Sequence, residues 1–141
     1  MLKHVTTSTF RHATLLLLTL LLGVGSAYGQ TPIQQRMAFY NPDGQLTFSA
    51  ERGETLWKKT NIAEDGKVRR CTTCHGDDLS KSGKHAKTGK VIDPLAPSAN
   101  AKRFTKLKKV KKWFKRNCKW TFGRECTTQE KGDLLMYLSQ F

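Results

Sequence analysis

A five-residue run in the middle of the chain carries residue types that suit one specific chemistry: Cys71-Thr72-Thr73-Cys74-His75. Two thiols at this spacing can add across the vinyl groups of a haem, and the adjacent imidazole can ligate the iron. A thioredoxin-like redox pair would need a βαβ context, and a zinc site would need a fourth ligand from a distant segment. The run therefore predicts one haem c, bound covalently through Cys71 and Cys74, with His75 as the proximal axial ligand.

The first 29 residues have the pattern of a secretory signal peptide. A basic start is followed by an almost wholly apolar run over 13–24 and by small residues over 25–29. This run is shorter than the roughly twenty apolar residues of a membrane span, so cleavage is expected rather than retention as an anchor. We expect a cut after Ala27 or Gly29, with 1–29 as the signal peptide and 30–141 as a single periplasmic domain.

The remaining two of the four cysteines, Cys118 and Cys126, lie eight positions apart. Disulfides persist outside the cytoplasm, and the haem takes the other two thiols. A disulfide between Cys118 and Cys126 is therefore predicted, and closing so short a loop stabilises a fold by roughly 2 to 3 kcal/mol.

The chain is strongly basic, with 25 Lys and Arg against 11 Asp and Glu and a formal charge of +14. Cleavage of the leader would remove only two of the basic residues, Lys3 and Arg11. Such an excess favours acidic partners or surfaces. Because export excludes nucleic acid, we expect an acidic redox partner and at most peripheral contact with an anionic membrane.

Three helices are expected to position the haem run. One follows the N-cap candidate Ser49, one spans Arg103 to Asn117 with a basic outer face, and one runs from about Thr128 to the C-terminus. Thr127 and Glu130 have the spacing of a capping box for the last helix. The other segments are expected to be irregular: the lead-in 30–47, the connection 60–70, the surface loop 76–90 and the proline-rich stretch 93–97.

This order of elements is similar to that of class I cytochromes c, which implies a mainly α fold around one covalent haem and a single cytochrome c domain over 30–141. Gly53 would let the first and last helices approach closely, with Leu134 and Tyr137 packing beside Trp57. Pro94 resembles the proline whose carbonyl accepts the Nδ1 hydrogen of the proximal histidine, although its spacing from the haem run is longer here.

The distal iron ligand is where this chain differs from class I cytochromes c. Those carriers usually have a methionine before the last helix, and this chain has none there. Met37 precedes the haem run, Met136 lies inside the terminal helix, and His85 follows His75 too closely to reach the opposite haem face easily. Asn117 is a polar residue on the apolar face of its helix. The residues alone leave two roles open for it, an iron ligand or a helix C-cap.

Several segments together resemble the SHP family of monohaem cytochromes. They are the runs 113–120 and 123–126 around the two later cysteines, the run 48–53, the haem run and the run 94–97. In that family an asparagine immediately before a disulfide cysteine is the sixth iron ligand. The resemblance covers nearly all of the mature chain and implies that His75 is the proximal ligand and Asn117 the distal one.

The ligand set implied by the resemblance suggests a function. An amide oxygen is a hard, neutral donor that suits ferric iron better than ferrous, so reduction should weaken the bond from Asn117 and open a site for dioxygen, nitric oxide or carbon monoxide. Members of the SHP family bind oxygen transiently and accept electrons from a dihaem cytochrome c. The basic helix face over 108–116 is the candidate docking surface for such a partner.

Two other functions stay open at this stage: a plain electron shuttle whose Asn117 remains bound, and a binding module without haem. No catalytic acid or base can be assigned from the sequence, so an enzymatic role is neither predicted nor excluded. Arg103, Arg116 and Arg124 are candidates for distal-side chemistry, for pairing with haem propionates or for solvation.

Overall fold

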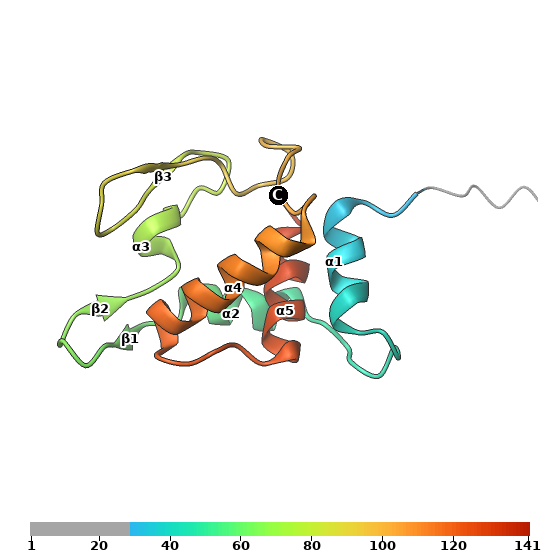
Figure 1. The fold of residues 1–141 in the computed structure, drawn as a ribbon, viewed down its shortest axis with the longest axis horizontal. Helices are drawn as coiled ribbons and strands as arrows, with labels where there is room; N and C mark the ends of the chain where they lie inside the picture. Colours follow the sequence, from blue (N-terminus) through green and yellow to red (C-terminus); the bar gives the residue numbers. More distant parts are fainter. Residues whose placement is uncertain (1–28) are drawn as a thin grey trace, which may run out of the picture.

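The computed structural model describes residues 29–141 and is mainly helical (Figure 1). The signal peptide expected over 1–29 lies outside the described residues, apart from its last position. Among the described residues, no helix is long and apolar enough to cross a membrane. The elements in chain order are α1 (Pro32–Tyr40), α2 (Ala50–Lys58), β1 (Asn61–Ile62), β2 (Val68–Arg69), α3 (Thr72–His75), β3 (Gly83–Lys84), β4 (Val91–Ile92), α4 (Leu107–Phe122) and α5 (Thr128–Leu138).

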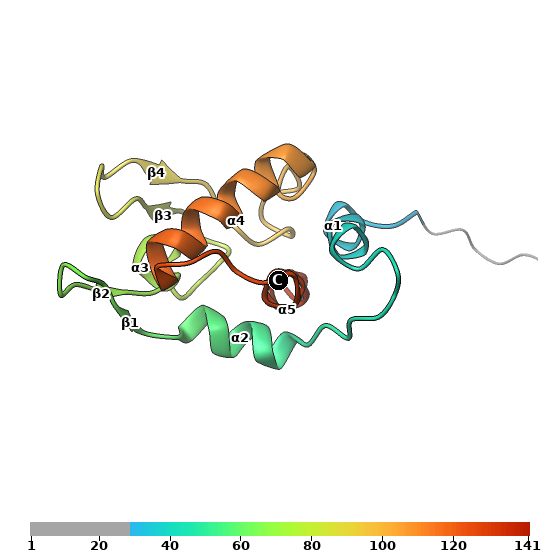
Figure 2. The same ribbon diagram turned by 60° about the horizontal axis from the view of Figure 1, so that its bottom comes forward.

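The core forms where α2 crosses α5, and α1 packs on another side of α5 (Figure 2). Gly53 permits this crossing, because a Cβ added there would lie 2.1 Å from the Asp133 carbonyl oxygen and 2.7 Å from Tyr137 Cβ. The Trp57 and Tyr137 rings lie 6.2 Å apart beside it. The close approach of the two helices at Gly53 is thus as the sequence predicts.

A buried carboxylate fixes the start of α2 against α5. Asp133 is 2% exposed, and its oxygens accept hydrogen bonds from the Ser49 backbone N–H at 2.7 Å, Arg52 at 2.9 Å and Gln129 at 2.9 Å. Burial opposes ionisation, but the Arg52 guanidinium and the other donors hold the pKa of Asp133 below its usual value. The charge is therefore retained at neutral pH, and it ties the two crossing helices together.

The N-terminal segment differs from the prediction, because 30–47 is not irregular throughout. Thr31 caps α1, its hydroxyl accepting from the Gln34 backbone while the Gln34 side chain accepts from the Thr31 backbone, and Pro32 occupies the first turn. Ile33 and Tyr40 of α1 are buried in the core. A turn at 41–44 follows the helix, closed by a hydrogen bond from the Gly44 N–H to the Asn41 carbonyl.

The third helix also differs, since α4 begins at Leu107 and continues past Asn117 to Phe122. Gly123 ends it in the left-handed conformation with a φ of 70°, which glycine adopts without strain. Asn117 is therefore not a C-cap, and that alternative is wrong. The helix continues because Cys118 and Thr121 extend its buried face by another turn.

The remaining elements are close to the predictions. Thr127 and Glu130 form the capping box of α5, as predicted. Two short antiparallel pairs, β1 with β2 and β3 with β4, interrupt the segments that the sequence analysis treats as loop.

Candidate haem site

The haem run forms one short turn of helix, with Cys71 at its N-cap and Thr72–His75 as α3. Neither Cys71 nor Cys74 is in a disulfide. Burial raises the pKa of the Cys71 thiol to about 11, although the Thr121 hydroxyl of α4 opposes that shift. The Sγ atom of Cys74 accepts a hydrogen bond from the Ala86 backbone at 3.4 Å. Both sulfur atoms are thus unbridged and available for addition to a haem vinyl group.

The imidazole of His75 is held against the core by Trp57, whose ring centroid lies 5.4 Å away. Burial, assisted by the positive charge of Arg103, lowers the pKa of His75 to about 4. The ring is therefore neutral at pH 7 and has a lone pair available for a metal.

The β3–β4 hairpin packs directly on the haem run. A Cβ added at Gly83 would lie 2.1 Å from the Cys74 carbonyl oxygen, so only glycine permits this approach. His85 lies on this hairpin, and its Nδ1 atom accepts from the backbone N–H groups of Lys87 and Thr88, both at 3.2 Å. The structure thus places His85 beside Cys74, on the side of the run that the hairpin covers.

The Pro94 carbonyl has other partners than the one suggested by the resemblance. It accepts hydrogen bonds from Arg103 Nε at 2.7 Å and Asn100 Nδ2 at 3.3 Å, while Arg103 also donates to the Asp93 carbonyl. Within residues 29–141, His75 makes no hydrogen bond to Pro94. Arg103 therefore fixes the proline-rich stretch 93–97 through two of its carbonyl groups. The sequence does not indicate this role, because the partners of Arg103 are backbone atoms.

The α4 helix presents two different faces, which corrects the prediction of a single apolar face that carries Asn117. Val110 is buried and Phe114 packs against the core, in line with Cys118 and Thr121. Trp113 is 46% exposed and Asn117 is exposed. We call the uncovered positions Trp113, Asn117 and the half-buried Trp120 the open flank of α4.

The open flank lies next to the haem run. Arg69, just before the run, donates to the Trp120 carbonyl at 3.2 Å, and its guanidinium lies 5.2 Å from the Trp120 ring centroid. Figures 1 and 2 both show α3 beside the C-terminal half of α4. The structure therefore brings the two thiols, the imidazole and the asparagine into one region of the fold.

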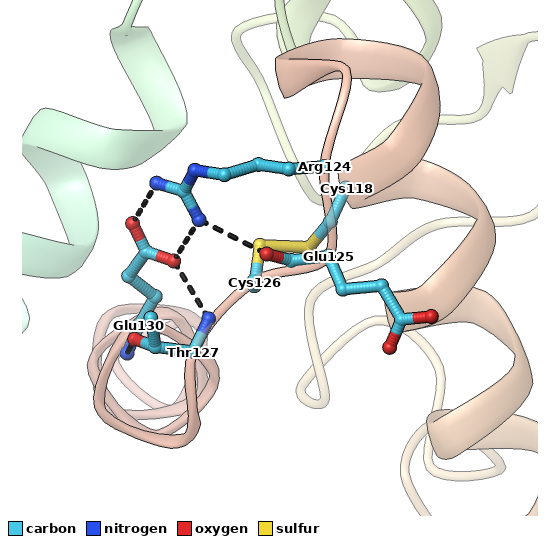
Figure 3. Close-up of a disulfide and its surroundings, with 6 residues drawn as sticks. All are labelled: Cys118, Arg124, Glu125, Cys126, Thr127 and Glu130. Atoms are coloured by element: carbon cyan, nitrogen blue, oxygen red, sulfur yellow. Dashed lines mark hydrogen bonds and ion pairs between the residues drawn. A yellow bond between two sulfur atoms is a disulfide. The ribbon is translucent and has the colours of Figure 1, made fainter.

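A disulfide fixes the chain immediately after Asn117 (Figure 3). Cys118 of α4 and Cys126 before α5 are joined by an S–S bond of 1.98 Å, with their Cα atoms 5.6 Å apart. Arg124 binds both carboxylate oxygens of Glu130, at 2.7 and 2.6 Å, and Glu130 also accepts from the Thr127 backbone at 2.8 Å. Arg124 is thus engaged in the loop between the helices rather than at the haem run.

The remaining candidates from the sequence are Met37, Met136 and Arg116. Met37 lies on α1 and packs on the core, and Met136 lies in α5. The Arg116 guanidinium lies 5.7 Å from the Trp113 ring centroid, beside the open flank.

Two unbridged thiols, a neutral imidazole and an uncovered aromatic flank fit a covalently bound haem. The zinc alternative fits less well, because within residues 29–141 no group of three or more His, Cys, Asp and Glu side chains could hold a metal ion.

Comparisons with known proteins support a haem cofactor. A family model described as a domain of unknown function, DUF1924, matches residues 43–138. Cytochrome c-type protein SHP of Cereibacter sphaeroides is 41% identical over 124 residues, which are 88% of this chain and 95% of the relative. The chain belongs to the SHP family of monohaem c-type cytochromes. It therefore carries one haem c, as the sequence predicts.

Solved structures show the same cytochrome c fold. The structure of oxidized SHP, described as an oxygen binding cytochrome c, is similar with a TM-score of 0.70 and 42% identity, over 80% of this chain and 100% of that one. Oxidized cytochrome c'' from Methylophilus methylotrophus has a TM-score of 0.67 and 31% identity, over 77% and 94% of the two chains. A solution structure of that cytochrome is described as giving insights into haem-ligand detachment, with a TM-score of 0.65 and 30% identity over 77% and 92%. The predicted family and fold class are thus confirmed.

Proposed function

We propose that this SHP-family cytochrome is exported to the periplasm and binds a diatomic gas at its ferrous haem, at a position that Asn117 occupies in the ferric protein. In this proposal Cys71 and Cys74 hold the haem covalently and His75 is the proximal ligand. A dihaem cytochrome c, or another acidic redox protein, supplies the electron. The signal peptide over 1–29 directs the export.

The observation that carries the proposal is the position of Asn117. It lies on the open flank of α4, next to Trp113 in the flank and one residue before the disulfide at Cys118. No packing role competes for the side chain, because it is exposed and within a helix rather than at its cap. An exposed amide on an otherwise aromatic flank is thus free to meet a haem that lies against the flank.

The chemistry of an amide ligand supports gas binding after reduction. The amide oxygen is neutral and hard, so its bond to ferrous iron is weaker than its bond to ferric iron. The departing side chain would keep an NH₂ donor near the vacated position, where it could hydrogen-bond an incoming dioxygen or nitric oxide. Two relatives support the loss of a ligand and the binding of gas, since SHP is described as oxygen binding and cytochrome c'' in connection with haem-ligand detachment.

The helical geometry of α4 supports a smaller docking surface than the one expected over 108–116. At 100° per residue, Lys109, Lys112 and Arg116 adjoin the open flank, and all three are exposed. We propose that these three residues, the haem-side basic face, meet the acidic redox partner. Positive charge next to the haem edge would steer and orient that partner.

The alternative is a periplasmic electron carrier with no physiological gas ligand, in which Asn117 stays bound in both oxidation states. The favourable position of Asn117 supports this alternative equally well, so only a measurement on the reduced protein separates the two.

Optical spectroscopy of the purified holoprotein tests the proposal. The ferric wild type should be six-coordinate and low-spin, and dithionite reduction should give a five-coordinate species whose Soret band shifts with carbon monoxide. Asn117→Ala should be five-coordinate or water-ligated in the ferric state, whereas Lys108→Ala, an exposed change on the same helix, should match the wild type. A reduced wild type that is six-coordinate, low-spin and unchanged by carbon monoxide would refute the gas-binding proposal.

A further inference from the structure

A recess lined with lysines lies where α1, α4 and α5 meet. Its volume is about 250 Å³, and its walls are Tyr40, Lys111, Lys112, Lys115, Glu125 and Lys131. They come from α1, α4, α5 and the loop before α5, and Figure 1 shows α1 on the opposite side of α4 from α3. We call this site the lysine recess. Its walls carry four lysines and one glutamate, a clear excess of positive charge, although the Lys112 ammonium group lies 5.7 Å from the centroid of the Trp113 ring.

Aromatic rings hold two of these ammonium groups without neutralising them. The Nζ atom of Lys111 lies 5.3 Å from the centroid of the Phe39 ring, and that of Lys131 lies 5.7 Å from the centroid of the Tyr40 ring. A cation over an aromatic face keeps its full charge while its side chain is restrained. These two lysines are therefore restrained, and within residues 29–141 neither forms an ion pair with an acid.

The one carboxylate in the recess walls, that of Glu125, lies between two lysines and is not within hydrogen-bond distance of either. Glu125 Oε1 lies 3.8 Å from Lys115 Nζ and 3.7 Å from Lys119 Nζ, beyond the length of a normal hydrogen bond. One acid between two lysines leaves the repulsion among the recess lysines largely uncompensated.

A tyrosine, Tyr40, also lines the recess. Tyr40 is buried and packs edge-on against Phe114, with ring centroids 6.0 Å apart. Burial raises the pKa of Tyr40, so its hydroxyl stays protonated and can donate a hydrogen bond to an anion.

We propose that the lysine recess binds a phosphate-type oxyanion, either a soluble phosphate or the headgroup of an anionic phospholipid. Lysine ammonium groups bind phosphate as point charges, and several around one small recess suit a multivalent anion. A recess of this size fits one such group and not the broad face of a protein. The site is separate from the haem and does not depend on the role of Asn117.

Calorimetric titration of the holoprotein with pyrophosphate at low salt tests the proposal. One site per chain is expected, and the double variant Lys111→Gln with Lys131→Gln should raise Kd by about tenfold, because two exposed charge contacts are lost. The matched control is Lys87→Gln with Lys90→Gln in the β3–β4 hairpin, which removes the same charge and should change Kd by less than about twofold. An unchanged Soret spectrum verifies that each variant retains its haem.

A second arm distinguishes the two sources of phosphate. If phosphatidylglycerol vesicles sediment the wild type, phosphatidylcholine vesicles do not, and pyrophosphate releases it, the ligand is a lipid headgroup. If only pyrophosphate binds, the ligand is a soluble phosphate. The proposal is overturned if pyrophosphate shows no saturable binding, or if both double variants lose affinity equally, since the attraction is then general and not located in the recess.

Discussion

Replacing Gly53 by alanine tests whether the contact between α2 and α5 positions the proximal side of the haem. The added Cβ would lie 2.1 Å from the Asp133 carbonyl oxygen and 2.7 Å from Tyr137 Cβ, so the two helices must separate. Overpacking costs about 1 to 3 kcal/mol where side chains can adjust, and here the nearest atom is rigid backbone, so we take about 3 to 4 kcal/mol. The helix propensity of alanine returns about 1 kcal/mol, which leaves a net loss of about 2 to 3 kcal/mol.

Thermal unfolding of the holoprotein, followed by far-UV circular dichroism, measures this loss. At about 4 to 8 °C per kcal/mol for a domain near this size, Tm should fall by roughly 10 to 20 °C. Trp57 lies on the same helix and its ring contacts His75, so the Soret circular dichroism should change as well. The control Thr55→Ala, an exposed change on α2, should leave Tm within a few degrees. If Gly53→Ala unfolds at the same temperature as Thr55→Ala, the reasoning is wrong.

The remaining predictions concern two charged features. Glu130→Gln keeps the capping hydrogen bond but removes the charge that Arg124 binds. Because that hydrogen-bonded pair lowers the pKa of Glu130 to about 2, the pair stabilises the fold above pH 4.5, and this stabilisation is lost as pH falls toward 2. Screening at the half-exposed Arg124 reduces the expected loss at pH 7 to about 1 to 2 kcal/mol by urea unfolding. The difference in free energy of unfolding from wild type should vanish near pH 2, and a difference that persists there would contradict the assigned role of the ion pair. Glu64→Gln is the control. For the haem-side basic face, the second-order rate of reduction by an acidic dihaem cytochrome should fall as salt rises, and a rate independent of salt would exclude electrostatic docking.

Much of the fold was predictable because the signals are local. The haem run is contiguous, and the cap of α5 follows from Thr127 and Glu130 three residues apart. The chain order of helices then indicates the crossing at Gly53. Family and fold class follow from the same short segments, which is why both predictions are confirmed.

The missed features depend on weaker signals or on distant partners. The capping box of α1 is present in the sequence, but only two residues of that helix are buried, so its periodicity is faint. The end of α4 was missed because Asn117 and the lysines around it mask a buried stripe that continues through Thr121. The network of Asp133 could not be predicted, since Arg52 lies 81 positions away.

The candidate site was predictable only in part. The residue types of the haem run indicate the cofactor, but they do not indicate that Arg103 donates a hydrogen bond to the Pro94 carbonyl. The helical period alone places Trp113 and Phe114 on one face. Only the packing of α1 and α5 decides that Phe114 enters the core and Trp113 stays uncovered.

Two restraints on α4 directly after Asn117 have a kinetic consequence. The disulfide at Cys118 holds the helix to the segment that leads into α5, and the contacts of Arg69 with Trp120 hold it to the segment before the haem run. An iron ligand at Asn117 could therefore not swing far away when its bond breaks. It would stay near the iron at high effective concentration after reduction, ready to bind again when the iron returns to the ferric state. The rigidity of this one helix would therefore speed the closing of the gas site on oxidation.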